Sequence, residues 1–248
     1  GQKVIVSRTV AEQDIEAYTK RDQNRPKRDA RVGMLPPKLA QIIVNLAGKH
    51  GLPKGSTPKP IPENTKAARL LDPFCGTGVV LQEAAFMGYD LYGTDAEPRM
   101  VEYTKTNLQW LRDTHEVRDF ELSLEAGDAT THTWQQPVDI IACEGSLGQP
   151  FSAFPSPEKL AEVTNTCNKI MRGFLKNIAG QIESGTRLAI ALPAWHKQSG
   201  DFVHLKLLDS LEELGYNRVS FVHVRDEDLL YYRPDQVVAR ELLVITRK

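Results

Sequence analysis

Four acidic residues follow short apolar segments of this 248-residue chain: Asp72, Asp95, Asp128 and Glu144. In an open parallel sheet, the carboxyl ends of the strands line the ligand crevice, so the four acids are expected to face one cleft. A single acid at a strand end is commonly only a turn residue or a helix cap. Four in succession favour a binding or catalytic site.

A glycine turn, Gly76-Thr77-Gly78, follows the first of these acids. Residues 70–84 are predicted to form a strand, this turn and a helix. Glycine lets the backbone come close to a ligand, and the helix directs its free N–H groups and positive dipole end at the same place. Asp95 comes 23 positions after Asp72, the separation expected when a second parallel strand brings an acid to a ribose hydroxyl pair. The spacing predicts a nucleoside-type cofactor.

The turn lacks the third glycine of a dinucleotide fingerprint, because Leu81 occupies that position. A pyrophosphate cofactor such as NAD is therefore disfavoured. Residues 72–78, Asp-Pro-Phe-Cys-Gly-Thr-Gly, instead resemble the first motif of the S-adenosylmethionine (SAM)-dependent amino-methyltransferases, which methylate exocyclic nitrogens of nucleic acid bases.

The charge balance is almost neutral, with 31 Lys and Arg against 32 Asp and Glu. Any nucleic acid binding must then come from a local patch. Residues 20–31 carry six basic and two acidic side chains. Within them Arg25, Lys27, Arg28 and Arg31 are candidates for phosphate contacts. A solvated connecting arm explains the same charges and stays open.

The three cysteines have no C-x-x-C spacing, which favours reduced thiols in a cytoplasmic protein. The six histidines are scattered without H-x-x-H spacing, so no metal is expected. No apolar run is long enough to cross a membrane, and no membrane partner is expected. The chain begins Gly1-Gln2, which we interpret as the start of a piece cut from a longer protein.

The elements predict an α/β fold with a doubly wound, mostly parallel seven-stranded sheet that ends in an antiparallel strand pair. Residues 1–32 are expected to be an N-terminal arm, and residues 33–248 one domain with a proline-rich loop at 51–64. The expected strands after the first are 91–95, 120–124, 138–143, 187–192, 218–224 and 236–246. The expected helices are 9–18, 38–47, 97–111, 157–182 and 201–214, and a short strand is expected at 3–6.

Two flanking regions narrow the resemblance. Residues 25–29 with 33–41, and residues 232–236 with 240–241, look like the flanks of the tRNA guanosine-N2 methyltransferases that carry an N-terminal THUMP domain. The resemblance implies a SAM cofactor with S-adenosylhomocysteine as product, a guanine N2 acceptor in tRNA or another structured RNA, and an upstream THUMP-type domain. An activating protein partner is a further possibility that it leaves open.

The resemblance also implies site residues. Asp72, Gly76 and Gly78 hold the amino acid end of the cofactor, Asp95 the ribose hydroxyls and Asp128 the adenine amine. The full cofactor set is Pro36, Pro37, Asp72, Phe74, Gly76, Gly78, Asp95, Ala96, Asp128 and Ala129. The predicted substrate set combines the basic segment, the catalytic motif and an aromatic pair beside an arginine, which could stack on an unpaired base or simply pack at a turn. It is Arg25, Lys27, Arg28, Arg31, Ser146, Leu147, Phe151, Tyr231, Tyr232 and Arg233.

The chain departs from the family at the catalytic motif. The family's fourth strand ends in Asp or Asn, then Pro-Pro, then an aromatic residue, where the acid accepts the amine hydrogens and the aromatic stacks on the base. Here residues 144–147 read Glu-Gly-Ser-Leu. Glu144 is expected to be the acceptor, with Phe151 or Phe154 in the stacking role. A different acceptor, such as a DNA base amine, and a SAM- and RNA-binding module without catalysis are the alternatives.

Overall fold

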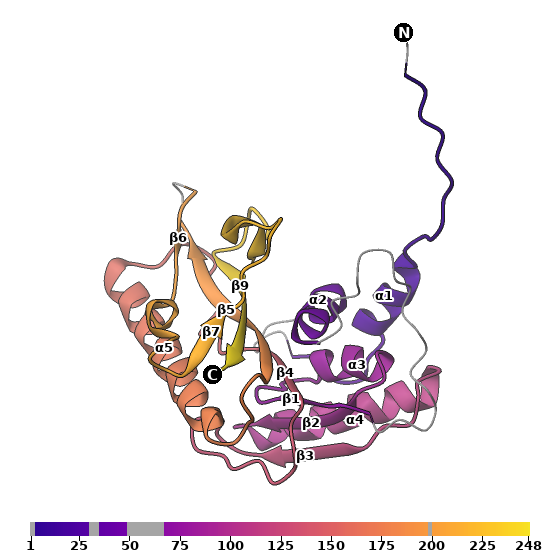
Figure 1. Cartoon of the computed structure of the whole chain (residues 1–248), viewed down its shortest axis with the longest axis horizontal. Coiled ribbons are helices and arrows are strands. Elements are labelled where there is room, and N and C mark those ends of the chain that lie inside the picture. The colour runs from indigo at the N-terminus through magenta and orange to yellow at the C-terminus, as the bar shows by residue number, and fades with distance from the viewer. Residues whose placement is uncertain (1–2, 30–34, 49–66, 198–199) are drawn as a thin grey trace.

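The computed structural model describes residues 3–29, 35–48, 67–197 and 200–248. These form a twisted sheet with helices on both faces (Figure 1). Along the sheet the strand order is β3-β2-β1-β4-β5-β9-β7, with two short strands attached at its side. The predicted α/β fold with a seven-stranded path is confirmed.

The first five strands of the path are parallel. Strand β9 runs antiparallel to β5, and β7 runs antiparallel to β9 and therefore in the same direction as the first five. The bounds are β1 Arg69–Asp72, β2 Asp90–Asp95, β3 Leu122–Ala126, β4 Ile140–Glu144, β5 Arg187–His196, β6 Phe202–Val203, β7 Tyr216–Arg218, β8 Leu230–Tyr231 and β9 Val238–Arg247. Because β1 and β4 are central and covered on both faces, the residues of both strands are buried, apart from the partly buried Glu144 at the end of β4, and their inner positions are apolar.

The helices separate into two layers. On one face lie α2 Pro37–Ala47, α3 Val79–Phe86 and α4 Pro98–Thr114, and on the other α5 Pro157–Ala179 (Figure 1). Each layer packs its own hydrophobic cluster against the sheet, and α5 shares its cluster with the 3₁₀ helix η1 Lys206–Ser210. In the described ranges no helix is both long and apolar enough to cross a membrane.

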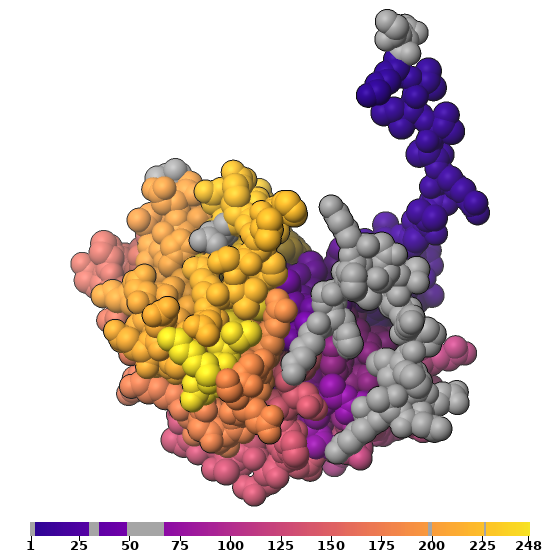
Figure 2. Space-filling model, viewed as in Figure 1, coloured from indigo at the N-terminus to yellow at the C-terminus, as the bar shows by residue number. Residues whose placement is uncertain are grey.

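The N-terminal segment differs from the expectation. Residues 3–14 contain no helix or strand and project away from the body (Figure 2). The helix predicted at 9–18 begins later, as α1 Ile15–Gln23, because the Asp14 side chain caps it by accepting from the Ala17 N–H. The predicted strand at 3–6 is wrong, since its apolar side chains stay exposed with no neighbouring strand.

Helix α1 is part of the fold. Arg21 forms an ion pair with Glu83 of α3, at 2.8 Å between Nε and Oε1, and its guanidinium lies over the rings of Tyr18 and Phe86. The Tyr18 hydroxyl also bonds to Gln41 of α2. The packed part of the chain therefore begins ahead of residue 33.

Two C-terminal predictions are also wrong. The helix expected at 201–214 is replaced by β6 and η1, because Phe202 and Val203 pair with β5. The strand expected at 218–224 is the shorter β7, which starts at Tyr216 and pairs with the end of β9. Val219 still bonds to Val244 of β9, but residues 220–224 form no strand, and Val222 is exposed. The loop predicted at 51–64 lies outside the described residues.

Candidate functional site

A cavity of about 250 Å³ opens where β1, β2 and β4 end. Three of the four acids identified in the sequence line it: Asp72, Asp95 and Glu144. The other lining residues are Leu35, Phe74, Cys75, Gly76, Thr77, Val79, Val80, Gly145, Ser146, Leu147 and Gly148. Parallel pairing of the strands brings these acids together, as expected from their positions at the strand ends.

The glycine turn follows Asp72; Gly76 and Thr77 line the cavity, whereas Gly78, also predicted as a cofactor residue, lies outside the lining. Gly76 and Gly78 have φ values of 51° and 84°, in the left-handed region that favours glycine. The Gly76 N–H donates to Oδ2 of Asp95 at 3.0 Å, and the Thr104 hydroxyl donates to the Gly76 carbonyl at 2.9 Å. A Cβ at Gly78 would lie 3.0 Å from the Thr104 side chain, so α4 packs directly against the turn.

The two acids beside the turn are held by backbone donors. Asp72 is 1% exposed and accepts from the Phe74 N–H, while Asp95 accepts from the N–H groups of Gly76 and Glu97. Burial raises the pKa of Asp72 well above its usual value and raises that of Asp95. A cavity with such carboxylates attracts a cationic ligand, which would relieve the cost of their burial.

Asp128 lies at the end of β3, exposed and outside the cavity lining. Its Oδ1 accepts from the backbone and the hydroxyl of Thr130, which lowers its pKa. It is therefore a carboxylate fixed on the rim, beyond the enclosed part of the site. Ala129, the neighbour predicted with it, is buried, and Ala96 beside Asp95 is exposed.

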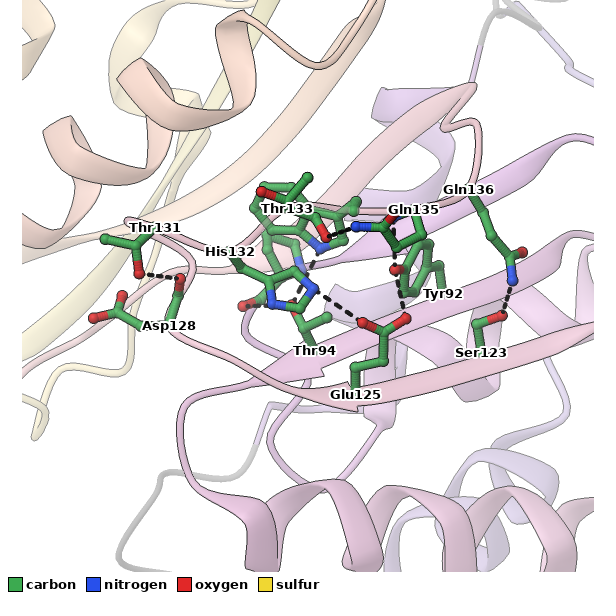
Figure 3. Close-up of polar contacts among 12 residues, drawn as sticks. Tyr92, Thr94, Ser123, Glu125, Asp128, Thr131, His132, Thr133, Gln135 and Gln136 are labelled. Carbon is green, nitrogen blue, oxygen red and sulfur yellow. Dashed lines mark hydrogen bonds and ion pairs between the residues drawn. The ribbon is translucent and has the colours of Figure 1, made fainter.

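The loop after Asp128 is anchored by the network in Figure 3. Glu125 accepts from the Tyr92 hydroxyl at 2.7 Å through Oε1, and its Oε2 lies 3.2 Å from Nε2 of His132. The His132 contact has the distance of an ion pair without the alignment of a hydrogen bond. Asn177 of α5 donates to the carbonyls of Ala129 and His132. These contacts position the rim that carries Asp128.

The loop of residues 144–148 is tightly packed, although its Gly-Ser sequence predicts flexibility. The Gly145 N–H donates to the Ala191 carbonyl at 2.9 Å, a bond that the family's proline could not make. A Cβ at Gly145 would lie 2.8 Å from the sulfur of Met171 on α5. Gly148 has a φ of +74°, and a Cβ there would meet Val163 at 2.6 Å. Glycine at both positions lets the loop pack against α5.

Glu144 forms an ion pair with Arg240 of β9, between Oε1 and Nε. Both side chains are largely buried. Burial raises the pKa of Glu144, and the neighbouring guanidinium opposes that rise. The predicted acceptor thus lines the cavity and is paired with a buried guanidinium.

The other predicted residues lie outside this lining. Phe151 and Phe154 are half-buried against the cluster around α5, and Tyr231 packs on the opposite cluster. Tyr232 is 41% exposed and contacts the rings of His196 and Phe202, next to exposed Arg233. Pro36 and Pro37 begin α2, directly after the lining residue Leu35.

The basic segment is divided by the fold. Arg25 is 3% exposed, with Nη2 3.6 Å from Asp22, and this placement does not favour a phosphate contact. Lys27 and Arg28 have exposed side chains. Asn107 bonds to the main chain of Lys27 and also donates to the Thr77 carbonyl, which ties the segment to the glycine turn. Arg31 lies outside the described residues.

Several lining residues were not predicted, notably Leu35, Val79, Val80 and Gly148. Arg240 was not assigned a site role either. A signal for it exists in the sequence, because Arg240 and Glu241 interrupt an otherwise apolar strand. A charged residue in a buried strand requires a partner.

The comparisons with known proteins agree with this geometry. A family model described as a methyltransferase domain matches residues 64–231. The tRNA (guanine(10)-N2)-dimethyltransferase of Methanothermobacter thermautotrophicus is 34% identical over 162 residues, 65% of this chain and 39% of that protein. The enzyme of that name from Pyrococcus abyssi is 33% identical over 195 residues, 77% of this chain and 46% of that protein.

This chain matches a larger share of the length of a third relative. The probable tRNA (guanine(10)-N2)-dimethyltransferase of Methanothermococcus thermolithotrophicus is 31% identical over 137 residues, 54% of this chain and 74% of that protein. The chain spans less than half the length of the first two relatives.

Two solved structures share the fold. TrmN from Thermus thermophilus has a TM-score of 0.53 at 17% identity, covering 96% of this chain and 55% of that one. Magnesium protoporphyrin IX methyltransferase from Synechocystis PCC 6803, solved with bound SAH, has a TM-score of 0.54 at 13% identity, covering 94% and 98%. The extent of the sequence matches shows that the chain belongs to the methyltransferase domain family and, within it, to the tRNA guanine-N2 methyltransferases.

Proposed function

We propose that this protein transfers a methyl group from SAM to the exocyclic N2 amine of a guanine in tRNA. The observation that carries the proposal is the Glu144 carboxylate, which faces the same cavity as Asp72 and Asp95. A cofactor site and an acceptor for amine hydrogens are then adjacent. The names of the relatives support tRNA guanine as the substrate.

The residues present suit this cofactor. SAM carries an ammonium and a sulfonium, and the carboxylates of Asp72 and Asp95 favour positive charge in the cavity. Small-molecule sites usually measure roughly 300–1,000 Å³. At about 250 Å³, the cavity has room for the methionine and ribose portions, with the adenine on the open rim beside Asp128.

The chain's own residues position the acceptor. Bound SAM supplies a methyl group on sulfur; as the N–C bond forms the S–C bond breaks, and the sulfur keeps the electron pair. Glu144 accepts the hydrogen bond of the attacking amine and takes up the proton that the nitrogen loses. Transfer depends on holding the nitrogen at near-attack distance, roughly 3–3.5 Å from the methyl carbon. The close packing of Gly145 and Gly148 on α5 gives Glu144 a fixed base for that task.

The proposal is tested with labelled SAM and unmodified tRNA, comparing wild type with Glu144→Ala. We expect label in the tRNA with wild type and a decrease of 100-fold or more with the variant, in the range of roughly 10²–10⁴ for a positioned acid or base. A thermal-shift series with SAM and NAD should show stabilisation by SAM alone. Equal incorporation by both proteins would remove Glu144 from the mechanism.

A second candidate is a SAM- and RNA-binding module without catalysis. It is favoured by the commitment of Glu144 to Arg240 and by Leu147, which stands where the family has its stacking aromatic. Stabilisation by SAM without incorporation into any tRNA, also after addition of candidate protein partners, would support it.

The RNA surface proposed here combines basic, aromatic and cavity-lining side chains. Lys27, Arg28 and Arg31 are assigned to phosphates and Tyr232 with Arg233 to an unpaired base. Ser146 and Leu147, which line the cavity, are assigned to the target guanine. The length of the relatives is compatible with an upstream THUMP-type domain, and a cytoplasmic location is part of the same proposal.

A further inference from the structure

The contact between Glu144 and Arg240 crosses an intervening strand. Glu144 pairs with Ala191 of β5, whereas Arg240 pairs with Pro193 farther along β5. The guanidinium thus reaches Glu144 across β5, from a position two residues nearer the carboxyl end of that strand. A guanidinium buried in this layer loses its hydration, so it needs an oppositely charged partner to offset that cost. Arg240 is 7% exposed.

The pair lies in an acidic setting. The charged groups around Glu144 are Arg240 from β9 and Asp72 from β1, and Asp95 lines the same cavity. The Cys143 thiol, next to Glu144 on β4, packs in the cluster on the opposite face of the sheet. Asp72 and the loss of water both disfavour a negative charge on Glu144. Among these groups, only Arg240 favours the ionised form of Glu144.

The contact is also directional. Nε of Arg240 donates to Oε1 of Glu144. A carboxylate held through one oxygen by a buried guanidinium cannot rotate freely. Glutamate has one more rotatable bond than the family's aspartate and therefore needs such a restraint more.

We propose that Arg240 is a positioning residue that holds the Glu144 carboxylate ionised and fixed at the cavity, with Oε1 bound from behind and Oε2 presented to the acceptor amine. The role in amine recognition rests on the proposed function. The charge and orientation of Glu144 do not, since they depend only on contacts within the chain.

The direct test is the titration of Glu144 by NMR in the protein labelled at glutamate side chains, with Glu144→Gln to assign the signal. In Arg240→Gln, loss of the cation should make Glu144 a weaker acid by about tenfold or more. Arg240→Lys should restore part of the acidity of Glu144 that Arg240→Gln removes. The matched control is Arg247→Gln on the same strand, whose guanidinium bonds to backbone carbonyls far from the site and should leave Glu144 unchanged.

Methyl transfer supplies a second readout. Arg240→Gln should lower kcat about tenfold or more at neutral pH, leave the KM for SAM unchanged, and move the acidic limb of the pH profile to higher pH, since the carboxylate then ionises later. Identical Glu144 titration in wild type and Arg240→Gln would overturn the inference. Absence of transfer in wild type would overturn the proposed function, while the titration would still decide the role of Arg240. If Arg240→Gln does not fold, the titration of Glu144 in Arg240→Lys tests the inference instead. The lysine ammonium is a point charge that cannot reproduce the Nε contact, so the pKa of Glu144 should shift, by less than is expected for Arg240→Gln.

Discussion

At the scale of single residues, the site depends on carboxylates kept in an environment that disfavours their charge. Asp72 is fully enclosed, and its pKa is raised by burial and by the nearby charges of Asp95 and Glu144. A carboxyl whose pKa is higher in the folded state binds protons more tightly there than in the unfolded chain. Stability therefore falls as the pH rises from the ordinary pKa of 3.8 toward the raised value. The negative charge of Asp72 that favours SAM binding therefore lowers the stability of the fold.

This conflict predicts opposite effects of Asp72→Asn. The amide removes the buried charge and keeps an oxygen for the Phe74 N–H, so Tm at pH 8 should rise and its decline between pH 5 and pH 8 should flatten. Loss of a charged hydrogen bond of about 1.5–3 kcal/mol should weaken SAM binding roughly tenfold to a hundredfold. Calorimetry of unfolding and of SAM binding measures both. Unchanged SAM affinity would contradict the assignment of Asp72.

At the scale of elements, the junction of β1 and α3 determines the shape of the cavity. The left-handed Gly78 begins α3, and α4 leaves no space for a side chain there. The acids and the turn could be located from the sequence because apolar runs, glycines and strand-end acids recur in order. The loop of residues 144–148 could not, because its rigidity depends on Met171 and Val163 from α5, which are distant in sequence.

Gly78→Ala tests the junction. A left-handed non-glycine residue costs about 1–2 kcal/mol, which should lower Tm by roughly 2–8 °C. SAM binding should weaken as well, because Gly76 and Thr77 of the same turn line the cavity. The matched control is Gly180→Ala at the end of α5, where φ is −83° and a Cβ meets nothing within 4 Å. A similar loss of Tm in both variants would argue against a specific role of the turn.

In the whole molecule, some basic side chains of residues 20–31 stabilise the fold and others are exposed on the surface. Its charge count alone predicts an arm, but Arg21 and Arg25 are used inside the protein. The sequence could not show this division, since it depends on which face of α1 meets α2 and α3. Likewise the mostly parallel seven-stranded sheet could be predicted from alternating strands and helices, whereas the replacement of a helix by β6 and η1 depends on pairing of β6 with β5.

Arg21→Ala tests whether α1 belongs to the fold. It leaves Glu83, which is 1% exposed, without its cation, and breaking a buried pair in this way costs about 3–5 kcal/mol. The neighbouring exposed Lys20 serves as the control, and Lys20→Ala should stay within about 0.5 kcal/mol of wild type. Chemical denaturation measures both. If the two variants are equally stable, residues 15–29 are a solvated arm and not part of the packed fold.

Methyl transfer to the N2 amine of a guanine in tRNA, the proposed activity, is measured most directly by mass spectrometry. The nucleosides are obtained from unmodified tRNA incubated with the protein and methyl-labelled SAM. We expect label in N2-methylguanosine or its dimethyl form, and none when the target guanosine is replaced by inosine, which lacks the amine. Label in a different nucleoside, or in the inosine-containing tRNA, would contradict it.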